Sequence, residues 1–367
     1  MIDGQLAAFA RTVDREIEAV VAASVDDPWT RSAISYHLGW ADRGFAALPS
    51  ERRAPGGKKL RPAMVLLCYQ GAKAALGPGE SCEAAVPFAA AVELVHNFSL
   101  IHDDIEDGDR TRRGRPTLWS LCGEGPAVQV GNTLLALAFT CLGRLHDHGI
   151  APRLCRELVA TLSDTVVDLT TGQHRDMAYE SADAIDGDMY LQMIAGKTGA
   201  LAACATYGGA MLAQDALDPV DPSRCEQLGW YRAFGMELGL AYQIRDDILG
   251  IWGDQSETGK SQSNDIRHRK KSFPIVFAFT NAAPDDCEHL HRLYRAPEEL
   301  TGRNEQEIRR ILAECGAQPA AQSQVEWHAE QARHALAAAT GGSGTVGRND
   351  SLAILDELAG SLTGRSR

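Results

Sequence analysis

The stretch AVELVHNFSLIHDDIEDGD, residues 91–109, carries the strongest signal for fold and function in this sequence. An apolar run with helical spacing ends in four acidic residues, Asp103, Asp104, Glu106 and Asp107. Asp103 and Asp107 are four residues apart, so on a helix they lie one turn apart on the same face. Two carboxylates at that spacing repel each other unless a cation lies between them, and Mg²⁺ prefers oxygen ligands of this kind. The cluster therefore indicates a Mg²⁺ site, although a solvated acidic helix end would explain it equally well by itself.

A second acidic pair lies in an equally apolar stretch, LGLAYQIRDDILGIWGD, residues 238–254. Asp246 and Asp247 are flanked by Leu, Ile and Ala, and the positions four residues from Asp246 are Tyr242 and Gly250, which carry no positive charge. Unpaired carboxylates are costly to bury in such a helix. Two acidic pairs on two apolar helices therefore predict a shared, inward-facing metal site.

Composition limits the fold class and the class of partner. The chain has 367 residues, which by length alone could form two or three domains, but no linker-like segment divides it. Strand-like alternation is scarce and aromatic residues make up 6% of the chain, so we predict an all-α protein. The net charge of −13 disfavours a nucleic-acid-binding protein. Apolar periodicity predicts helices at 3–24, 29–47, 61–75, 83–107, 126–147, 151–178, 187–195, 222–251 and 351–362.

The cysteines and the N-terminus indicate the compartment. Nine cysteines stand at scattered spacings without a CxxC pair, which predicts reduced thiols in a reducing compartment and no zinc site. The first helix carries charges throughout and lacks the apolar core of a signal peptide. No stretch approaches the ~18 uncharged apolar residues of a membrane-spanning helix. We therefore expect a cytoplasmic protein without a transmembrane segment.

The stretch GGKKLRP, residues 56–62, places several positive charges at the start of a helix. Lys58, Lys59 and Arg61 follow two flexible glycines, and Pro62 suits the first helical turn. Backbone flexibility beside cations at a helix N-terminus favours anion binding. An ordinary basic loop is the simpler alternative for this stretch taken by itself.

Further cations lie near both acidic stretches. Four arginines directly follow the first acidic cluster, at positions 110, 112, 113 and 115. These arginines could pair with the acidic cluster or hold a diphosphate, whose oxygens the guanidinium group binds in a bidentate way. Lys197 and Thr198 place a cation and a hydroxyl at a predicted break between two helices.

Together these segments resemble the trans-isoprenyl diphosphate synthases, or polyprenyl synthetases. The similarity runs from about Gly56 to Pro274 in the order of the family's motifs, which here read GGKKLRP, the Asp-rich stretch with its Arg pair, GKTG, YQIRDD, GK at 259–260 and NDIRHRKKSFPI. The resemblance implies one domain over residues 1–367, in which helices of 275–367 complete a bundle of roughly a dozen helices around a central cavity, the isoprenoid synthase fold. It also implies that the two Asp-rich helices face each other across the mouth of that cavity.

The resemblance implies a prenyltransferase that condenses isopentenyl diphosphate with an allylic diphosphate, with Mg²⁺ as cofactor. Asp103, Asp104 and Asp107 would hold Mg²⁺ against the allylic diphosphate, and Asp246 would hold a further ion, with about three ions in all. The residues implied to bind the allylic diphosphate are Arg112, Lys197, Lys260 and Lys270. Those implied to bind isopentenyl diphosphate are Lys58, Arg61, His96 and Arg113. Thr198 and Gln243 would line the reacting centre.

Two residues before the first acidic cluster bear on product length. Ser99 lies four residues before Asp103, about 6 Å deeper along the helix, and Phe98 lies one residue further back. In the family, bulky residues at both places suit a C15 product. One bulky and one small residue favour a C20 product, geranylgeranyl diphosphate. A C15 or C25 product remains open, because residues on neighbouring helices also form the floor of the cavity.

The sequence departs from the family pattern at two positions. Gly250 stands where the second motif usually has its last Asp, and Asn132 stands where an Asp is common. Asp254 could compensate for Gly250 only if the helix ended early. A terpene cyclase of the same fold and a non-catalytic subunit are therefore alternatives. The residues implied for isopentenyl diphosphate favour the synthase, since a cyclase has no use for a second diphosphate site. The apolar helix 126–142 would suit a homodimer interface, and the family is usually dimeric.

Overall fold

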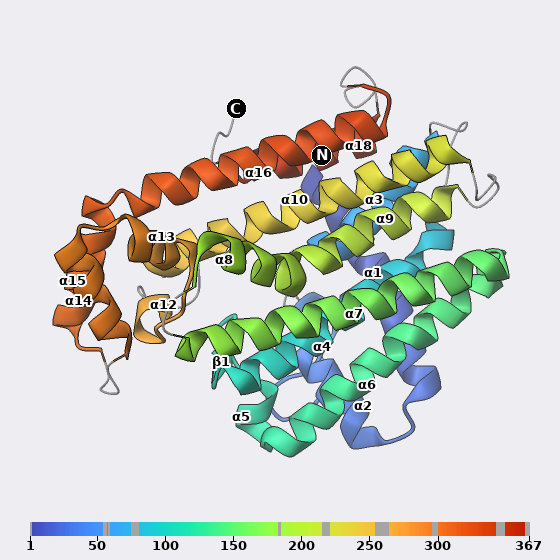
Figure 1. The fold of residues 1–367 in the computed structure, drawn as a ribbon. Coiled ribbons are helices and arrows are strands. Elements are labelled where there is room, and N and C mark those ends of the chain that lie inside the picture. The colour runs from blue at the N-terminus through green and yellow to red at the C-terminus, as the bar shows by residue number, and fades with distance from the viewer. Residues whose placement is uncertain are drawn as a thin grey trace. The chain divides into compact units, whose positions relative to one another are not determined.

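The computed structural model describes residues 2–53, 57, 59–74, 81–182, 185–214, 221–253, 264–295, 300–342 and 349–363 (Figure 1). Nearly all regular structure in these residues is helical. The one sheet found among them is a two-stranded antiparallel ladder of Thr111–Arg112 (β1) and Arg115–Pro116 (β2). The predicted all-α class is therefore confirmed.

The helices follow one another along the chain with short connections. The α-helices are α1 (Ile2–Ser24), α2 (Pro28–His37), α3 (Leu60–Ala74), α4 (Val86–Glu106), α5 (Leu118–Cys122), α6 (Glu124–Gly143), α7 (Pro152–Ser181), α8 (Gly187–Ile194), α9 (Ala200–Ala213), α10 (Pro222–Trp252), α12 (Asn264–Arg267), α13 (Phe273–Asn281), α14 (Pro284–Arg295), α15 (Gly302–Glu314), α16 (Ala317–Ala339) and α18 (Asp350–Ser361). Short 3₁₀ turns are η1 (Ser50–Arg52), η2 (Glu83–Ala85) and η3 (Arg144–His148), and η4 (Ala195–Gly199) is a π-helical turn.

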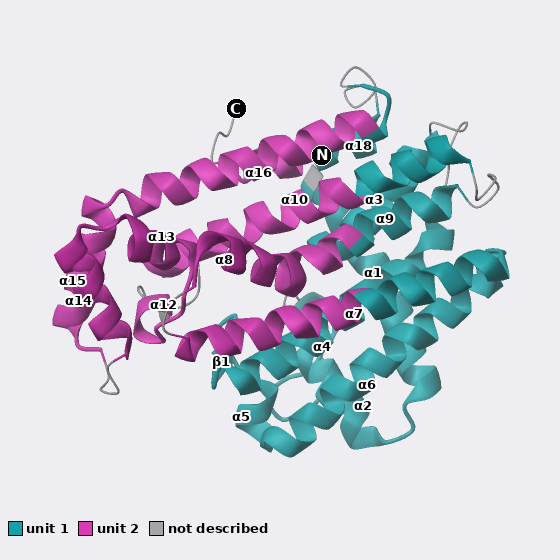
Figure 2. Ribbon diagram, in the orientation of Figure 1, with its two compact units in different colours: residues 1–164, 204–231, 339–355 teal, residues 165–203, 232–338, 356–367 magenta. Residues whose placement is uncertain are grey.

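The chain divides into two compact units (Figure 2). Unit 1 contains residues 1–164, 204–231 and 339–355, and unit 2 contains residues 165–203, 232–338 and 356–367. The single domain predicted from the absence of a linker stays a prediction.

Helix α4 forms the core of unit 1. Helices α1, α3 and α6 pack against it, and its side chains from Val86 to Val95 are all buried. Pro87 lies in the first turn, where a missing N–H leaves no helical bond unmade. The helix ends at Glu106, and Gly108 follows with φ 66°, a conformation that glycine adopts without strain. Each fully buried Val or Leu contributes ~1.5–3 kcal/mol, so this burial fixes the acidic end of α4 in place.

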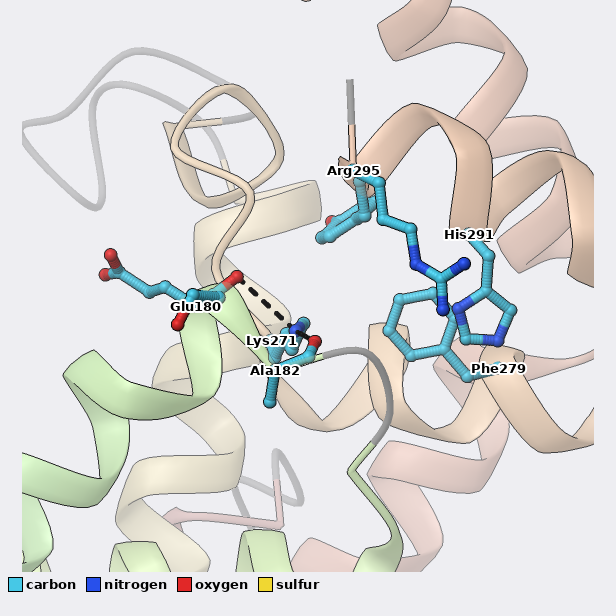
Figure 3. A pocket seen from close by; sticks show the side chains of 8 residues that line it. Glu180, Ala182, Lys271, Phe279, His291 and Arg295 are labelled. Atoms are coloured by element: carbon cyan, nitrogen blue, oxygen red, sulfur yellow. Dashed lines mark hydrogen bonds between the residues drawn. The ribbon is translucent and has the colours of Figure 1, made fainter. Parts of the chain in front are cut away.

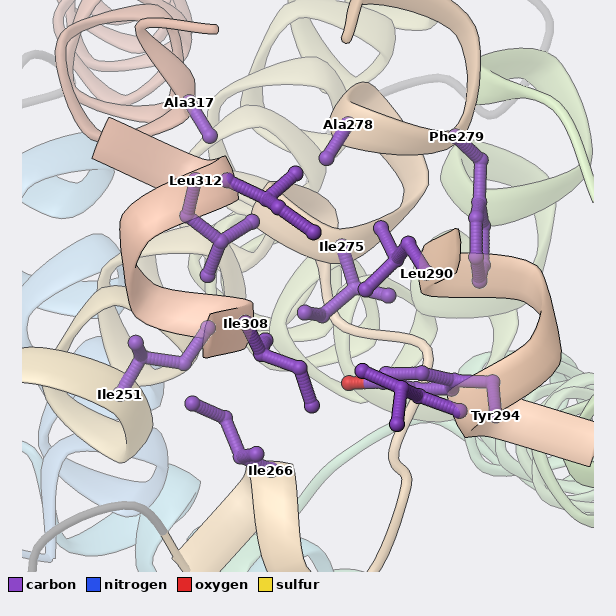
Figure 4. Packing of buried hydrophobic residues seen from close by; sticks show 12 residues of the cluster. Ile251, Ile266, Ile275, Ala278, Phe279, Leu290, Tyr294, Ile308, Leu312 and Ala317 are labelled. Atoms are coloured by element: carbon purple, nitrogen blue, oxygen red, sulfur yellow. The ribbon is translucent and has the colours of Figure 1, made fainter. Parts of the chain in front are cut away.

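A separate apolar cluster forms the core of unit 2 (Figure 4). Ile251 from α10 meets Ile266 from α12 and Ile275 from α13, and all three side chains are fully buried. Leu290 of α14 and Ile308 of α15 complete the same cluster. This packing joins the end of α10, which carries the second acidic pair, to the helices that follow it.

Two predicted helix boundaries are wrong. The helix predicted over 29–47 ends at His37, because Gly39 and Phe45 have positive φ angles of 85° and 63° and the Asp42 side chain accepts hydrogen bonds from two later backbone N–H groups. The break predicted at Lys197 is absent, since η4 joins α8 to α9 as one continuous helix with a π-helical turn.

Two described helical segments are long and apolar enough to cross a membrane by composition. They are Glu83–Glu106, of which 78% of the apolar window is buried, and Glu124–His148, of which 44% is buried. Burial inside a core explains the composition of the first, as in many core helices. The predicted absence of a transmembrane segment stays a prediction.

Candidate functional site

The acidic end of α4 is paired with the hairpin that follows it. Arg113 and Gly114 form the turn between β1 and β2, both with positive φ, 53° and 71°, as a tight two-residue hairpin requires. The hairpin returns Arg112 to the helix, where its Nε donates to Asp104 Oδ1 at 2.6 Å and its guanidinium lies 3.4 Å from Asp103 Oδ2. Of the two alternatives for this arginine, pairing with the acidic cluster is the one that the structure contains.

Burial gives Asp104 an unusual electrostatic state. Its side chain is 2% exposed, whereas Asp103 is half-buried and Asp107 is exposed. Burial raises the pKa of Asp104 to about 6, with Arg112 opposing the rise and Asp103 adding to it. The carboxylate of Asp104 therefore faces its arginine in the interior of unit 1.

The residues at this helix end fit a Mg²⁺ ion in part. Asp103 and Asp107 are one turn apart, since the Asp107 N–H donates to the Asp103 carbonyl oxygen at 2.9 Å, and both offer the oxygen ligands that Mg²⁺ prefers. Asp104 does not point the same way, because its carboxylate is bonded to Arg112. Among the described residues, no group of three or more His, Cys, Asp or Glu side chains is arranged to hold a metal ion.

Three of the four residues predicted to bind isopentenyl diphosphate lie together in unit 1. The Arg61 guanidinium is 3.5 Å from His96 Nε2. Burial first, then the charges of Arg61 and Arg113, lower the pKa of His96 well below its ordinary value, so this imidazole is neutral. Gly57 has φ 92°, and a β-carbon there would overlap the Arg113 guanidinium, which therefore lies directly against the backbone. The fourth residue, Lys58, lies outside the described residues.

Lys59 has a role that its motif did not indicate. Its side chain is buried and forms an ion pair with Asp14 of α1. This contact ties the start of α3 to α1. Lys59 thus stabilises the segment beside Arg61, and it does not point toward the His96 group.

The residues predicted to set product length lie on the buried part of α4. Phe98 is 5% exposed and meets the His102 ring edge-on at 4.7 Å. The Ser99 hydroxyl donates to the His96 carbonyl oxygen at 2.8 Å. Asn132 on α6 is exposed.

The second acidic pair, in unit 2, is divided between solvent and interior. Asp246 is exposed, whereas Asp247 is 2% exposed and accepts hydrogen bonds from the Tyr190 hydroxyl at 2.6 Å and the Phe273 N–H at 2.8 Å. Burial raises the pKa of Asp247, and Lys270 opposes that rise. Asp247 and Tyr190 are parts of the site that sequence reasoning missed, because nothing in the sequence shows which Asp of an adjacent pair faces inward.

A hydrogen-bond chain connects Asp247 to both residues predicted at the reacting centre. Gln243 Nε2 donates to Asp247 Oδ1 at 3.1 Å, and Gln243 Oε1 accepts from the Thr198 hydroxyl at 2.7 Å. The amide of Gln243 is therefore held at both ends. The structure confirms that Thr198 and Gln243 are adjacent, although their role stays a prediction.

Lys197 occupies the π-helical turn of η4. Its ammonium group donates to Asp176 Oδ2 at 2.6 Å. The turn packs directly on α7, since a β-carbon at Gly172 would overlap the backbone of Lys197. Lys197, Gln243, Asp247 and Lys270 line one small cavity of about 10 Å³ within unit 2. Lys260, predicted to act with Lys197 and Lys270, lies outside the described residues.

Lys271 was not singled out in the sequence, yet it is buried at the same place. Its ammonium donates to the backbone oxygens of Tyr179, at 2.5 Å, and Ala182, at the C-terminal end of α7, where a positive charge is favourable. It also borders a larger cavity of about 340 Å³, where the rings of Phe279 and His291 stack at 4.3 Å beside Arg295 (Figure 3). None of the residues predicted from the sequence is among those that line this cavity.

The departure at Gly250 has a steric reason. A β-carbon at this position would overlap the carboxylate of Asp265, which lies directly against α10. The space that an aspartate at 250 would need is thus already filled by another carboxylate. Asp254, considered as a compensating residue, lies outside the described residues.

Comparison with known proteins gives a consistent result. A family model described as polyprenyl synthetase matches residues 47–314. The chain is 40% identical over 289 residues to a geranylgeranyl diphosphate synthase of Mycobacterium tuberculosis, covering 78% of this chain and 75% of that protein. It is 39% identical over 255 residues to a (2E,6E)-farnesyl diphosphate synthase of Mycobacterium bovis, covering 68% of this chain and 64% of that protein. The crystal structure of a polyprenyl synthase from Caulobacter crescentus, complexed with calcium and isoprenyl diphosphate, matches with a TM-score of 0.77 and 26% identity, covering 100% of this chain and 97% of that one.

Proposed function

The chain belongs to the polyprenyl synthetase family, and from this premise we propose that it joins isopentenyl diphosphate to an allylic diphosphate and forms all-trans geranylgeranyl diphosphate. It is a prenyltransferase of the all-α isoprenoid synthase fold, and its relatives elongate prenyl diphosphates. The two substrates and the C20 length are the specific content of the proposal.

The observation that carries the proposal is the cationic group of unit 1. Arg61, Arg113 and the neutral His96 lie together beside the acidic end of α4. Condensation requires binding a second diphosphate, that of isopentenyl diphosphate, and guanidinium and imidazole groups suit phosphate oxygens. A cyclase acts on one prenyl diphosphate and would not need such a group.

Mg²⁺ would be held by Asp103, Asp107 and Asp246, whose carboxylates are half-buried or exposed. When bound, the ions would neutralise the allylic diphosphate as Lewis acids and so make it a leaving group. The calcium and isoprenyl diphosphate bound by the Caulobacter crescentus relative support a divalent cation beside the substrate. Asp104, buried against Arg112, would position that arginine.

The remaining side chains would bind the allylic diphosphate and orient the reacting centre. Arg112, Lys197 and Lys270 would complement its charge. Gln243, fixed between Thr198 and Asp247, would present one amide orientation to the substrate. The proton lost after condensation would go to the released diphosphate, since the described residues suggest no protein base for it.

The C20 length rests on the floor that α4 would provide. Phe98 is bulky and buried, while Ser99, one turn before Asp103, is small and bonded back to its own helix. The relatives named above include a synthase of a C20 product and one of a C15 product, so homology supports either length. The small side chain at 99 is what favours the longer product.

A product assay tests this function. The purified protein would be incubated with Mg²⁺ and isopentenyl diphosphate, together with dimethylallyl, geranyl or farnesyl diphosphate in parallel, and the prenols analysed after phosphatase treatment. We expect a C20 prenol that disappears in Asp103→Ala. A cyclic hydrocarbon made without isopentenyl diphosphate would instead identify a cyclase. The absence of any product with every starter would indicate a subunit that needs a partner.

We also propose a homodimer acting in the cytoplasm. Helix α6 is apolar, yet 44% of its most apolar window is buried within one chain. A second copy packed on α6 would cover that surface, and an aqueous compartment is where the water-soluble diphosphate substrates are found.

A further inference from the structure

His37 belongs to none of the family's motifs, yet the fold brings it to the cationic group of unit 1. It is the last residue of α2, and the preceding Tyr36 fixes the end of that helix. The Tyr36 hydroxyl donates to the Pro116 carbonyl oxygen at 2.7 Å, and the Arg115 guanidinium lies 4.4 Å above the Tyr36 ring. The end of α2 is thereby held against the hairpin that carries Arg112 and Arg113.

One nitrogen of the His37 ring is bonded and the other is not. Asn97 hydrogen bonds to His37, and since the Asn97 amide nitrogen donates to Glu93 at 2.8 and 3.1 Å, its carbonyl oxygen is left to accept from the ring. This bond uses Nδ1 and places the ring proton there. Nε2 is buried and has no hydrogen-bond partner among the described residues. Buried polar atoms without partners are rare and often mark a place where a ligand binds.

The charges around His37 are predominantly positive. The groups that face it are Arg112, Arg113 and Arg115 from the hairpin and Asn97 and His96 from α4. Burial first, then Arg112 and Arg113, lower the pKa of His37 to about 3, so the ring is neutral at physiological pH. An anion with several oxygens is the kind of ligand that would relieve this arrangement, because it would satisfy Nε2 and offset the arginine charges together.

We propose that His37 is a further diphosphate-binding residue, whose Nε2 takes up a proton as the diphosphate of isopentenyl diphosphate binds and then donates it in a charge-assisted hydrogen bond. This inference rests on the proposed function, because Arg61, His96 and Arg113 would bind the same diphosphate. It assigns a role to a residue at the end of α2, far from the motifs in sequence.

Isothermal titration of isopentenyl diphosphate into the full-length protein tests this without turnover, since no allylic substrate is present. Titrations in two buffers of different ionisation enthalpy give both Kd and the number of protons taken up. We expect His37→Ala to bind roughly 10- to 100-fold more weakly than the wild type, as for loss of a charge-assisted hydrogen bond. His37→Gln, which can donate but cannot titrate, should retain part of the affinity and lose the proton uptake assigned to His37.

His148→Gln, an exposed histidine in η3, is the matched control and should behave as the wild type in both measurements. In steady state, the KM for isopentenyl diphosphate should rise in His37→Ala while the KM for the allylic substrate changes little. Wild-type affinity in His37→Ala, or equal proton uptake in the wild type and His37→Gln, would overturn the proposal. If His37→Ala does not fold, the proton count of His37→Gln decides. A wild-type protein that makes no product from the two diphosphates would instead refute the proposed function.

Discussion

At the scale of single residues, Glu93 is a carboxylate in the apolar core of α4. It is 2% exposed, and burial raises its pKa despite the nearby Lys59 and Arg61. A carboxyl group whose pKa is raised by folding binds its proton more tightly in the folded state. The free energy of unfolding therefore falls as pH rises from the ordinary pKa of Glu, about 4.3, through the raised value.

Glu93→Gln should remove that pH dependence while keeping an acceptor for the Asn97 amide. We expect the variant to be more stable than the wild type by roughly 1 kcal/mol near neutral pH, with the advantage shrinking as pH falls toward about 4. Urea denaturation at a series of pH values measures this directly. A variant that is less stable than the wild type at every pH would show that Glu93 is ionised and paired with the neighbouring cations.

Gly250 tests the steric reason for the departure from the family pattern. In Gly250→Ala the new β-carbon overlaps the Asp265 carboxylate, so we expect a loss of ~1–3 kcal/mol in unfolding free energy. Gly229→Ala is the matched control, since Gly229 lies on the same helix with open space around it and should gain ~0.5–1 kcal/mol from helix propensity. In Gly250→Ala/Asp265→Ala the overlap is removed, so most of the loss at 250 should be absent. Equal effects at 250 and 229 would contradict the contact.

At the scale of elements, the π-helical turn η4 is the clearest case of backbone packing that positions a side chain. In Gly172→Ala the added methyl overlaps the backbone of Lys197 and should displace its ammonium group from Asp176. We expect the KM for the allylic diphosphate to rise about 10-fold or more, because this lysine would bind that substrate. Gly143→Ala, at the open end of α6, should leave the KM unchanged. A normal KM in Gly172→Ala would remove Lys197 from the proposed binding group.

The elements themselves were largely predictable, because apolar periodicity reports burial. The predicted helix 61–75 is Leu60–Ala74, and the predicted helix 222–251 is Pro222–Trp252. The helix predicted over 29–47 failed because its pattern continues through Gly39, whose left-handed conformation depends on the local turn. The break predicted at Lys197 failed because a glycine read as a breaker was needed for close packing on α7.

The candidate site was predictable in its residue types and not in its orientations. In both acidic pairs the second aspartate, Asp104 or Asp247, is 2% exposed, while the first is more accessible. Neighbouring residues on a helix point about 100° apart, so only one of each pair can face inward. The choice is made by partners elsewhere in the chain, Arg112 for Asp104 and Tyr190 for Asp247, and no local pattern encodes such contacts.

At the scale of the whole molecule, the apolar composition of α6 allows two interpretations. Its length and composition would suit a membrane, but its window also has buried positions, and the exposed remainder would suit a second copy of the chain. We expect the protein to elute without detergent at twice its chain mass of 39.6 kDa in size-exclusion chromatography with light scattering. Ala136→Glu places a charge on the exposed side of α6 and should shift the protein to monomer, because a buried unpaired charge is costly. Ala313→Glu, exposed on α15, is the control and should remain dimeric. A wild-type monomer in buffer would contradict the dimer, and partition into liposomes in sedimentation would favour the membrane instead.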